Sequence, residues 1–361
     1  MPETKMRTPL PEPFFAISPE RFLQRAKAPA RLLHITNGSI AADILRESGV
    51  PGLVTITADV LHEGPTPAGL PPERWRKVRA RYLAESGYGG YDECLSTLTE
   101  WDHALEDHRT VDEMVLWFEH DLFDQLLLIR TLDGLASRDL GLTRLSLICI
   151  GEHPEVKPFH GLGQLSPEQM AALLETRRPV TRDQMVLARH AWRAFCAAEP
   201  IGIEVAIRRD TSTLPFLAGA LHRHLQEFPA LRGGLSRTER QALEALAAAG
   251  GSLSFEDLFR ASQDLEERRF LGDTSFLRRL QELSDDPRRL VRLEREPGGG
   301  PRGLRVILTA TGQEVLDGRD DWVRVHGIDR WLGGVHLHGR EAQWRWDAER
   351  DRLVPGALVV E

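Results

Sequence analysis

The chain has 361 residues, of which 41% are hydrophobic and 28% charged, and its formal net charge is −8. This composition is typical of a globular protein with more than one domain and argues against a disordered chain. The negative charge offers no general attraction for nucleic acid or an anionic membrane. Three separated cysteines without a CxxC pair argue against a disulfide framework. No apolar run is long enough for a signal peptide or membrane span, so we expect a cytoplasmic protein.

The N-terminal part of the chain has the element order of a βαβ unit. Residues 1–29 contain several prolines and little periodicity, so we expect a poorly ordered lead-in. Two apolar, β-branched runs then flank a stretch with helical spacing, in the order 31–36, 39–48 and 53–61. Strand, glycine turn, helix and strand in this order predict a parallel sheet.

The same alternation continues beyond the second strand. Helical patterns fill most of residues 71–108 and 121–136, and apolar runs occupy 113–120 and 144–151. These strands are apolar along their whole length, as expected for strands that are covered on both faces. We therefore predict that residues 30–165 form an α/β domain with an open, mostly parallel, Rossmann-like sheet.

The second half of the chain predicts a different architecture. Residues 166–232 read as a helical region that packs on the α/β domain. Residues 233–318 contain three helical patterns, followed by two strand-like runs around a Gly/Pro turn, which is the order of a winged helix. Residues 319–361 read as a small tail of short strands and turns.

The first strand is followed by Asn37, Gly38 and Ser39 at the start of a helix. Neither GxGxxG nor GxxxxGK[ST] is present, so no standard phosphate-binding loop is indicated. Ser39 as a helix cap is the simpler interpretation. The alternative is an anion site, because a glycine turn at a helix N-terminus presents free N–H groups and the positive end of the helix dipole.

Titratable side chains are concentrated after the later strands, and the carboxyl ends of parallel strands meet in one crevice. The candidate catalytic residues are His62, Glu63, Glu119, His120, Asp121 and Asp124. The candidate ligand-binding residues are Asn37, Gly38, Ser39, Asp59, Gln125 and His160. Carboxylates beside histidines suit acid–base chemistry or a divalent metal. The spacing does not favour a metal, since there is no HExxH motif, and the cofactor is left open.

Each of these residues also has a structural interpretation. Asp121 can cap the helix that follows it, Glu119 can pair with an arginine such as Arg79 or Arg81, and a histidine can pack in a core. His222 and His224 lie two residues apart in a helical pattern, so they point to different faces, and we expect both to be solvated.

Several long segments resemble the bacterial domain-of-unknown-function 1835 family. They are HITNGSIAADILRESGVPG, DVLHEGPTPAGL, LWFEHDLFDQLLL and FHGLGQLSPEQ, with GLSRTERQALEAL, FLGDTSF and DRWLGGVHL resembling the C-terminal part of its longer members. The resemblance extends from about residue 31 to 354 but implies no established activity. Related proteins commonly have Asp at the position of Ser39, which weakens Ser39 as a nucleophile or as a required metal ligand.

Two functions are therefore expected. The first is binding of a small anionic, nucleotide-like ligand at the strand ends, with hydrolase or transferase activity. The alternative is a ligand-sensing regulator that acts through the winged-helix-like domain on DNA or a protein partner. Charge disfavours DNA, because the candidate recognition helix carries Arg278 and Arg279 together with Asp273, Glu282 and Asp285.

Overall fold

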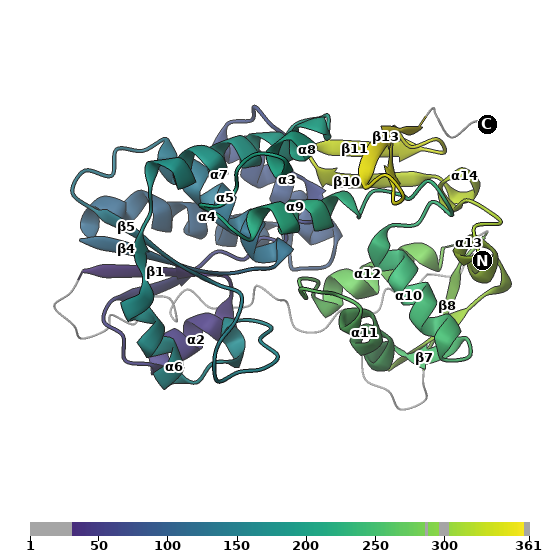
Figure 1. The fold of residues 1–361 in the computed structure, drawn as a ribbon, viewed down its shortest axis with the longest axis horizontal. Coiled ribbons are helices and arrows are strands. Elements are labelled where there is room, and N and C mark those ends of the chain that lie inside the picture. The colour runs from purple at the N-terminus through teal and green to yellow at the C-terminus, as the bar shows by residue number, and fades with distance from the viewer. Residues whose placement is uncertain (1–30, 286–287, 296–302, 357–361) are drawn as a thin grey trace.

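The computed structural model describes residues 31–285, 288–295 and 303–356, so the predicted lead-in 1–29 lies outside the described residues (Figure 1). Its central feature is a five-stranded sheet with the strand order β2-β1-β4-β5-β6. The strands in that order are Leu53–Ile56, Leu32–Thr36, Glu113–Glu119, Arg144–Ile150 and Arg178–Pro179. The first four are parallel, and β6 is antiparallel to β5. The α/β class and the mostly parallel sheet are confirmed.

Strand β4 is buried along its whole length because helices cover both faces of the sheet. Its residues Met114, Leu116 and Phe118 pack in one hydrophobic cluster, and Val115 and Trp117 pack in another. The first cluster includes α5, α7, α8 and α9 (Leu122–Ala136, Arg182–Phe195, Ile201–Ile207 and Leu217–Leu225). The second includes α2, α4 and α6 (Ser39–Glu47, Tyr91–Glu106 and Pro167–Leu173). Successive side chains of a strand point to opposite faces, so β4 contributes to a hydrophobic cluster on each face of the sheet.

Strand β2 is shorter than the predicted run 53–61. The backbone N–H of Thr57 still donates to the Thr36 carbonyl at 2.8 Å, but Leu61 N–H then closes a turn on the Asp59 carbonyl. The Asp59 side chain is held by Arg79 of α3 (Pro72–Glu85), which draws the chain away from the sheet. Within the predicted helical region 166–232, the two-residue strand β6 was not expected.

A separate hydrophobic cluster lies between residues 235 and 322. It joins helices and strands in the order α10, β7, α11, α12, β8, β9 (Arg237–Ala248, Ser252–Ser254, Phe255–Asp264, Asp273–Leu283, Val291–Arg295 and Leu304–Leu308). The strands form an antiparallel sheet in the order β7-β9-β8. We call residues 235–325 the C-terminal unit; its assignment to the winged-helix class stays a prediction.

The tail packs against the α/β part of the chain. It contains β10, β11, β12 and β13 (Ile328–Gly333, Val335–Gly339, Trp344–Asp347 and Arg352–Pro355), preceded by the short helices α13 and α14 (Ala310–Leu316 and Trp322–His326). Strand β10 pairs in parallel with β3 (Gly64–Pro65), and Trp346 and Leu353 join the cluster around α5. Among the helices described, none combines the length and the apolar character that crossing a bilayer requires.

Candidate functional site

The sheet has a topological switch point between β1 and β4. The chain runs from β1 to β2 on one side and later returns to β4 on the other side of β1. Connections that leave in opposite directions open a crevice beyond the carboxyl ends of those two strands, where α/β proteins bind ligands. Asn37 follows β1 and Glu119 ends β4, so this crevice joins two of the predicted junctions.

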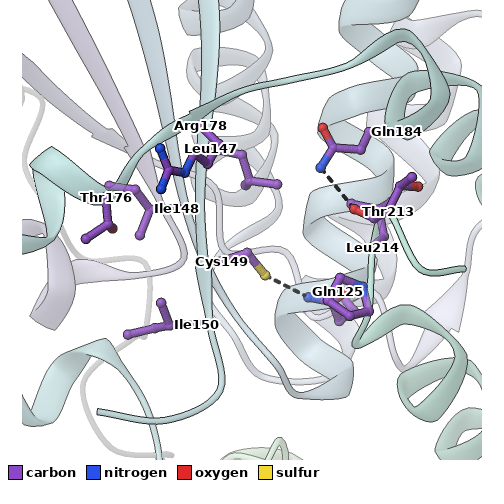
Figure 2. A pocket seen from close by; sticks show the side chains of 11 residues that line it. Gln125, Leu147, Ile148, Cys149, Ile150, Thr176, Arg178, Gln184, Thr213 and Leu214 are labelled. Carbon is purple, nitrogen blue, oxygen red and sulfur yellow. Dashed lines mark hydrogen bonds between the residues drawn. The ribbon is translucent and has the colours of Figure 1, made fainter. Parts of the chain in front are cut away.

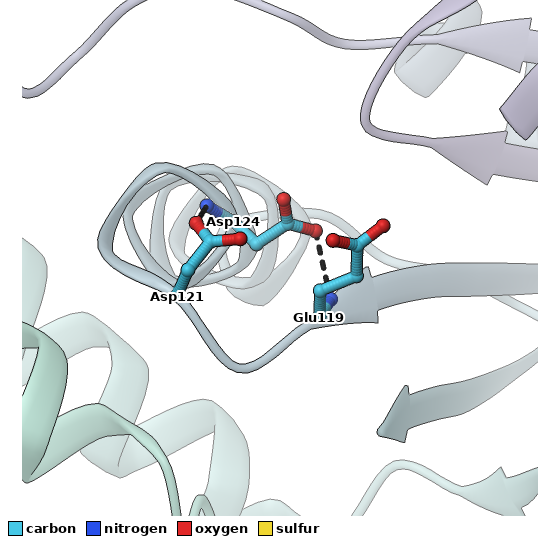
Figure 3. A group of neighbouring side chains, drawn as sticks. All are labelled: Glu119, Asp121 and Asp124. Atoms are coloured by element: carbon cyan, nitrogen blue, oxygen red, sulfur yellow. Dashed lines mark hydrogen bonds between the residues drawn. The ribbon is translucent and has the colours of Figure 1, made fainter. Parts of the chain in front are cut away.

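Three carboxylates converge at this crevice (Figure 3). Glu119, Asp121 and Asp124 each offer one oxygen atom, and these atoms lie within 4.8 Å of one another. The residues are 5%, 4% and 1% exposed. Asp121 caps α5 by accepting the Asp124 N–H at 3.1 Å, and Asp124 accepts the Glu119 N–H at 2.7 Å. The tight β4–α5 turn therefore fixes the Asp121 and Asp124 side chains, and the helix-cap interpretation of Asp121 is confirmed.

Asn37 links the β1 junction to this carboxylate cluster. Its Nδ2 donates to Glu119 Oε1 at 3.0 Å and to Asp124 Oδ2 at 2.8 Å. Glu119 Oε1 also accepts the Leu162 N–H at 2.6 Å, and a Cβ at Gly161 would clash with the Glu119 carboxylate. Because both amide protons of Asn37 are committed, its side chain orients carboxylates in this structure rather than facing a ligand.

The electrostatics of the cluster are unfavourable without a cation. Burial raises the pKa of Glu119, Asp121 and Asp124, and the Glu119 charge raises that of both aspartates further. None of the three forms an ion pair with a basic side chain in the described ranges. Buried carboxylates without a positive partner must take up protons or bind a cation, because desolvation otherwise costs several kcal/mol per charge. This donor set of oxygen atoms suits Mg²⁺ or Mn²⁺.

Two histidines lie close to the cluster. The His120 ring packs between Phe159 and Phe216, with ring centroids 6.1 and 5.9 Å away. Burial, with a smaller contribution from Arg268, lowers the pKa of His120 to about 4, so the ring is neutral at neutral pH. Its Nδ1 is buried and has no partner in the described parts of the chain. Burial also lowers the pKa of His160, in the loop after β5.

A cavity of about 250 Å³ lies along the end of β5, and Gln125 of α5 forms part of its lining (Figure 2). Gln125 connects the cavity to the carboxylate cluster, since its Nε2 donates to the Glu119 carbonyl at 2.6 Å and approaches Cys149 Sγ at 3.4 Å. Arg178 and Gln184 add polar groups to the lining. The volume is slightly below the usual range for small-molecule pockets, so the cavity suits a small group rather than a whole cofactor.

The residues after β2 do not join the carboxylate cluster. Asp59 forms a fully buried, bidentate ion pair with Arg79, at 2.6 and 3.0 Å. Arg79 is therefore the partner of Asp59, and the suggested pairing of Glu119 with Arg79 is wrong. Neither side chain of this pair is exposed to solvent, so Asp59 has a structural role.

His62 and Glu63 face the C-terminal unit instead. The His62 ring packs against Phe123 and Phe270, with centroids 6.0 and 5.4 Å away, and burial lowers its pKa. Glu63 accepts hydrogen bonds from Tyr88 at 2.5 Å and from Ser275 of α12 at 3.1 Å. Both residues thus belong to the contact between the two parts of the molecule.

The start of α2 differs from its expected form. The helix begins at Ser39, and Gly38 occupies the cap position without a side-chain cap. The prediction that Ser39 caps the helix is wrong, because the helix includes one residue more than expected. Ser39 is exposed, and the first turn of α2 opens beside Asn37.

The GLG turn at 161–163, which follows the fourth predicted strand, closes over this crevice, and its Gly161 and Leu162 position Glu119. One contributor was not singled out from the sequence. Arg268 donates to the His120 carbonyl at 3.3 Å from a distant segment, and no local pattern marks it.

A search with protein-family models finds no match for the chain, and a search of curated protein sequences finds none either. The resemblance to the domain-of-unknown-function 1835 family therefore stays a prediction.

Proposed function

We propose that the α/β part of this protein binds a divalent cation together with a small anionic, nucleotide-like ligand, and hydrolyses or transfers a group from that ligand. The observation that carries the proposal is the buried cluster of Glu119, Asp121 and Asp124 at the switch point of the sheet. None of the three carboxylates forms an ion pair within the described residues, and Asn37 holds two of them in place. The family resemblance and a cytoplasmic location are retained as proposals beside it.

The residues fit a hard cation better than the sequence spacing indicated. Glu119, Asp121 and Asp124 would hold it through carboxylate oxygens, and the cation would neutralise their charge and polarise a phosphate or carboxylate group of the ligand. His120 is neutral at neutral pH and its Nδ1 has no partner among the described contacts, so the neutral imidazole can hydrogen-bond to the ligand. The uncapped first turn of α2 offers N–H groups to an anion.

Thermal-shift titrations test the cation and the ligand separately. We expect Mg²⁺ or Mn²⁺ to raise the Tm of the wild-type protein, and nucleotides to raise it further, because a ligand of the folded state stabilises by mass action. Asp124→Asn should abolish the cation response. Asp139→Asn is the matched control, since Asp139 is exposed and its carboxylate contacts Arg109 and the Gly141 N–H, away from the cluster. A wild-type protein that responds to neither cation refutes the proposal.

The alternative function is a regulator in which the C-terminal unit is a winged helix. The order α10, β7, α11, α12, β8, β9 and the antiparallel sheet support this classification. Arg278 and Ser275 of α12, however, contact the α/β part, so this helix does not present a free basic face. A salt-dependent DNA titration of the full chain tests the DNA version, and no binding at low salt removes it.

A further inference from the structure

The C-terminal unit is fixed to the α/β part by polar contacts of α12. Ser275 Oγ lies 2.7 Å from Tyr88 Oη and donates to Glu63 at 3.1 Å. Arg278 donates to Ser86 Oγ at 2.6 Å, and its guanidinium covers the Tyr82 ring at 4.7 Å. Tyr82, Ser86 and Tyr88 come from α3 and the segment that follows it, and Glu63 directly precedes β3, so α12 serves as the docking helix of the unit.

The loop between α11 and α12, residues 265–272, reaches into the core of the α/β part. Phe270 is 9% exposed and belongs to the same hydrophobic cluster as α5. The Arg223 guanidinium covers its ring at 4.9 Å, and Arg223 is itself held by Glu227 and Glu266. A loop anchored at a buried aromatic ring holds its neighbouring residues in fixed positions.

Arg268 lies two residues before this anchor and next to the carboxylate cluster. Its Nη1 donates to the His120 carbonyl at 3.3 Å, and its guanidinium lies over the Phe216 ring at 5.4 Å. Gly219 leaves room for it, since a Cβ there would lie 3.2 Å from Nη1. The neighbouring Arg269 pairs with Asp264, whereas Arg268 forms no ion pair within the described ranges, although its charge acts on Asp121.

We propose that Arg268 binds the anionic group of the ligand, so that the C-terminal unit completes the site of the α/β part. The inference rests on the function proposed above and identifies the ligand group as a phosphate. A half-buried guanidinium that forms no ion pair within the described residues, held beside carboxylates that suit a cation, gives a phosphate both of its natural contacts. The contact to His120 is to a backbone oxygen, which leaves most of the guanidinium N–H donors free for a ligand.

Two binding measurements on the full chain distinguish cation binding from phosphate binding. Mn²⁺ binding is measured alone by its paramagnetic resonance signal, and inorganic phosphate binding is then measured by calorimetry at saturating Mn²⁺. Arg268→Ala should weaken phosphate binding by about 10- to 100-fold, as expected for a lost charge-assisted contact. Mn²⁺ affinity should stay the same or increase, because a nearby positive charge is removed. The phosphate affinity of Arg268→Lys should lie between those of the wild type and Arg268→Ala, since lysine keeps the charge without the guanidinium fork.

The control is Arg260→Ala, which removes an exposed arginine of α11 that pairs with Asp257. It should leave both affinities unchanged. If Arg268→Ala binds phosphate as tightly as the wild type, the inference is wrong while the cation site stands. If Arg268→Ala loses Mn²⁺ affinity as well, Arg268 has a structural role and the inference is also wrong. A wild-type protein that binds no Mn²⁺ overturns the proposed function itself.

Discussion

The bridge formed by Asn37 can be tested by exchanging its side chain with that of Asp124. Asn37→Asp replaces the amide donor by an acceptor at 3.0 Å from Glu119 and 2.8 Å from Asp124. Asp124→Asn alone places two amide groups opposite each other. The double variant restores one amide and one carboxylate in opposite positions, and the asparagine introduced at position 124 can still accept the Glu119 N–H through its oxygen atom.

The expected magnitudes follow from these contacts. Asn37→Asp loses two hydrogen bonds to carboxylates, each worth about 1.5–3 kcal/mol. It also adds a like charge whose repulsion at such distances is about 5 kcal/mol at an effective dielectric constant of about 20, until proton uptake relieves it. We therefore expect a loss of at least about 3 kcal/mol in the free energy of unfolding. The double variant should be more stable, by about 2 kcal/mol or more, than the sum of the two single-variant effects predicts.

Urea unfolding at neutral pH with EDTA, followed by circular dichroism, measures all four proteins of this double-mutant cycle. The midpoint of the double variant should lie above that of Asn37→Asp and below that of the wild type. Additive losses, with no coupling between the two positions, would show that Asn37 does not bridge the carboxylates. An Asn37→Asp protein as stable as the wild type would refute the electrostatic reasoning directly.

Three further substitutions give sharp outcomes. Arg79→Met leaves Asp59 buried and unpaired, so thermal or urea unfolding should show a loss of about 3–5 kcal/mol. Burial lowers the pKa of His224 to about 3, so the unfolded chain binds a proton below pH 6.5 that the folded chain does not, and stability falls as the pH decreases. The free energy of unfolding of His224→Leu, relative to that of the wild type, should therefore rise by about 1.4 kcal/mol between a pH well above 6.5 and one pH unit below 6.5. A difference between the two proteins that does not change with pH would contradict this. Gly161→Ala should displace the Glu119 carboxylate. In thermal-shift assays the Tm increase that Mn²⁺ produces should therefore shrink by more than the Tm without Mn²⁺ falls.

The strand-end residues of the site could be predicted because βαβ alternation fixes where strands end. Asn37 and the segment from Glu119 to Asp124 follow apolar runs in the sequence, and both lie at the carboxyl ends of parallel strands. The sequence order does not say that β4 lies beside β1, which is what brings these two junctions together. Asp59 follows β2, an edge strand, so it meets α3 and Arg79 instead of the cluster.

The histidines of α9 show how long-range packing overrides a local pattern. We expected His222 and His224 on solvated faces, and the side chain of His222 is indeed partly exposed, next to Asp351. The expectation for His224 is wrong, because its ring is fully buried against Phe195 and Phe228. A helix in contact with elements on several sides has no simple polar face, and spacing alone cannot reveal those neighbours.

The carboxylate cluster serves the fold and the proposed function at the same time. Asp121 caps α5, and Asp124 closes the β4–α5 turn on the Glu119 N–H, so alanine at either position would remove a structural hydrogen bond together with a charge. Asparagine keeps the acceptor of that structural hydrogen bond at each position and removes the charge, although at position 124 it also removes the acceptor for Asn37. Because burial raises the pKa of both aspartates, their ionisation opposes folding, and an asparagine variant can be more stable than the wild type without a cation. A protein that gains stability but loses its Mg²⁺ response on Asp124→Asn would therefore separate the two roles, since a purely structural aspartate should lose stability.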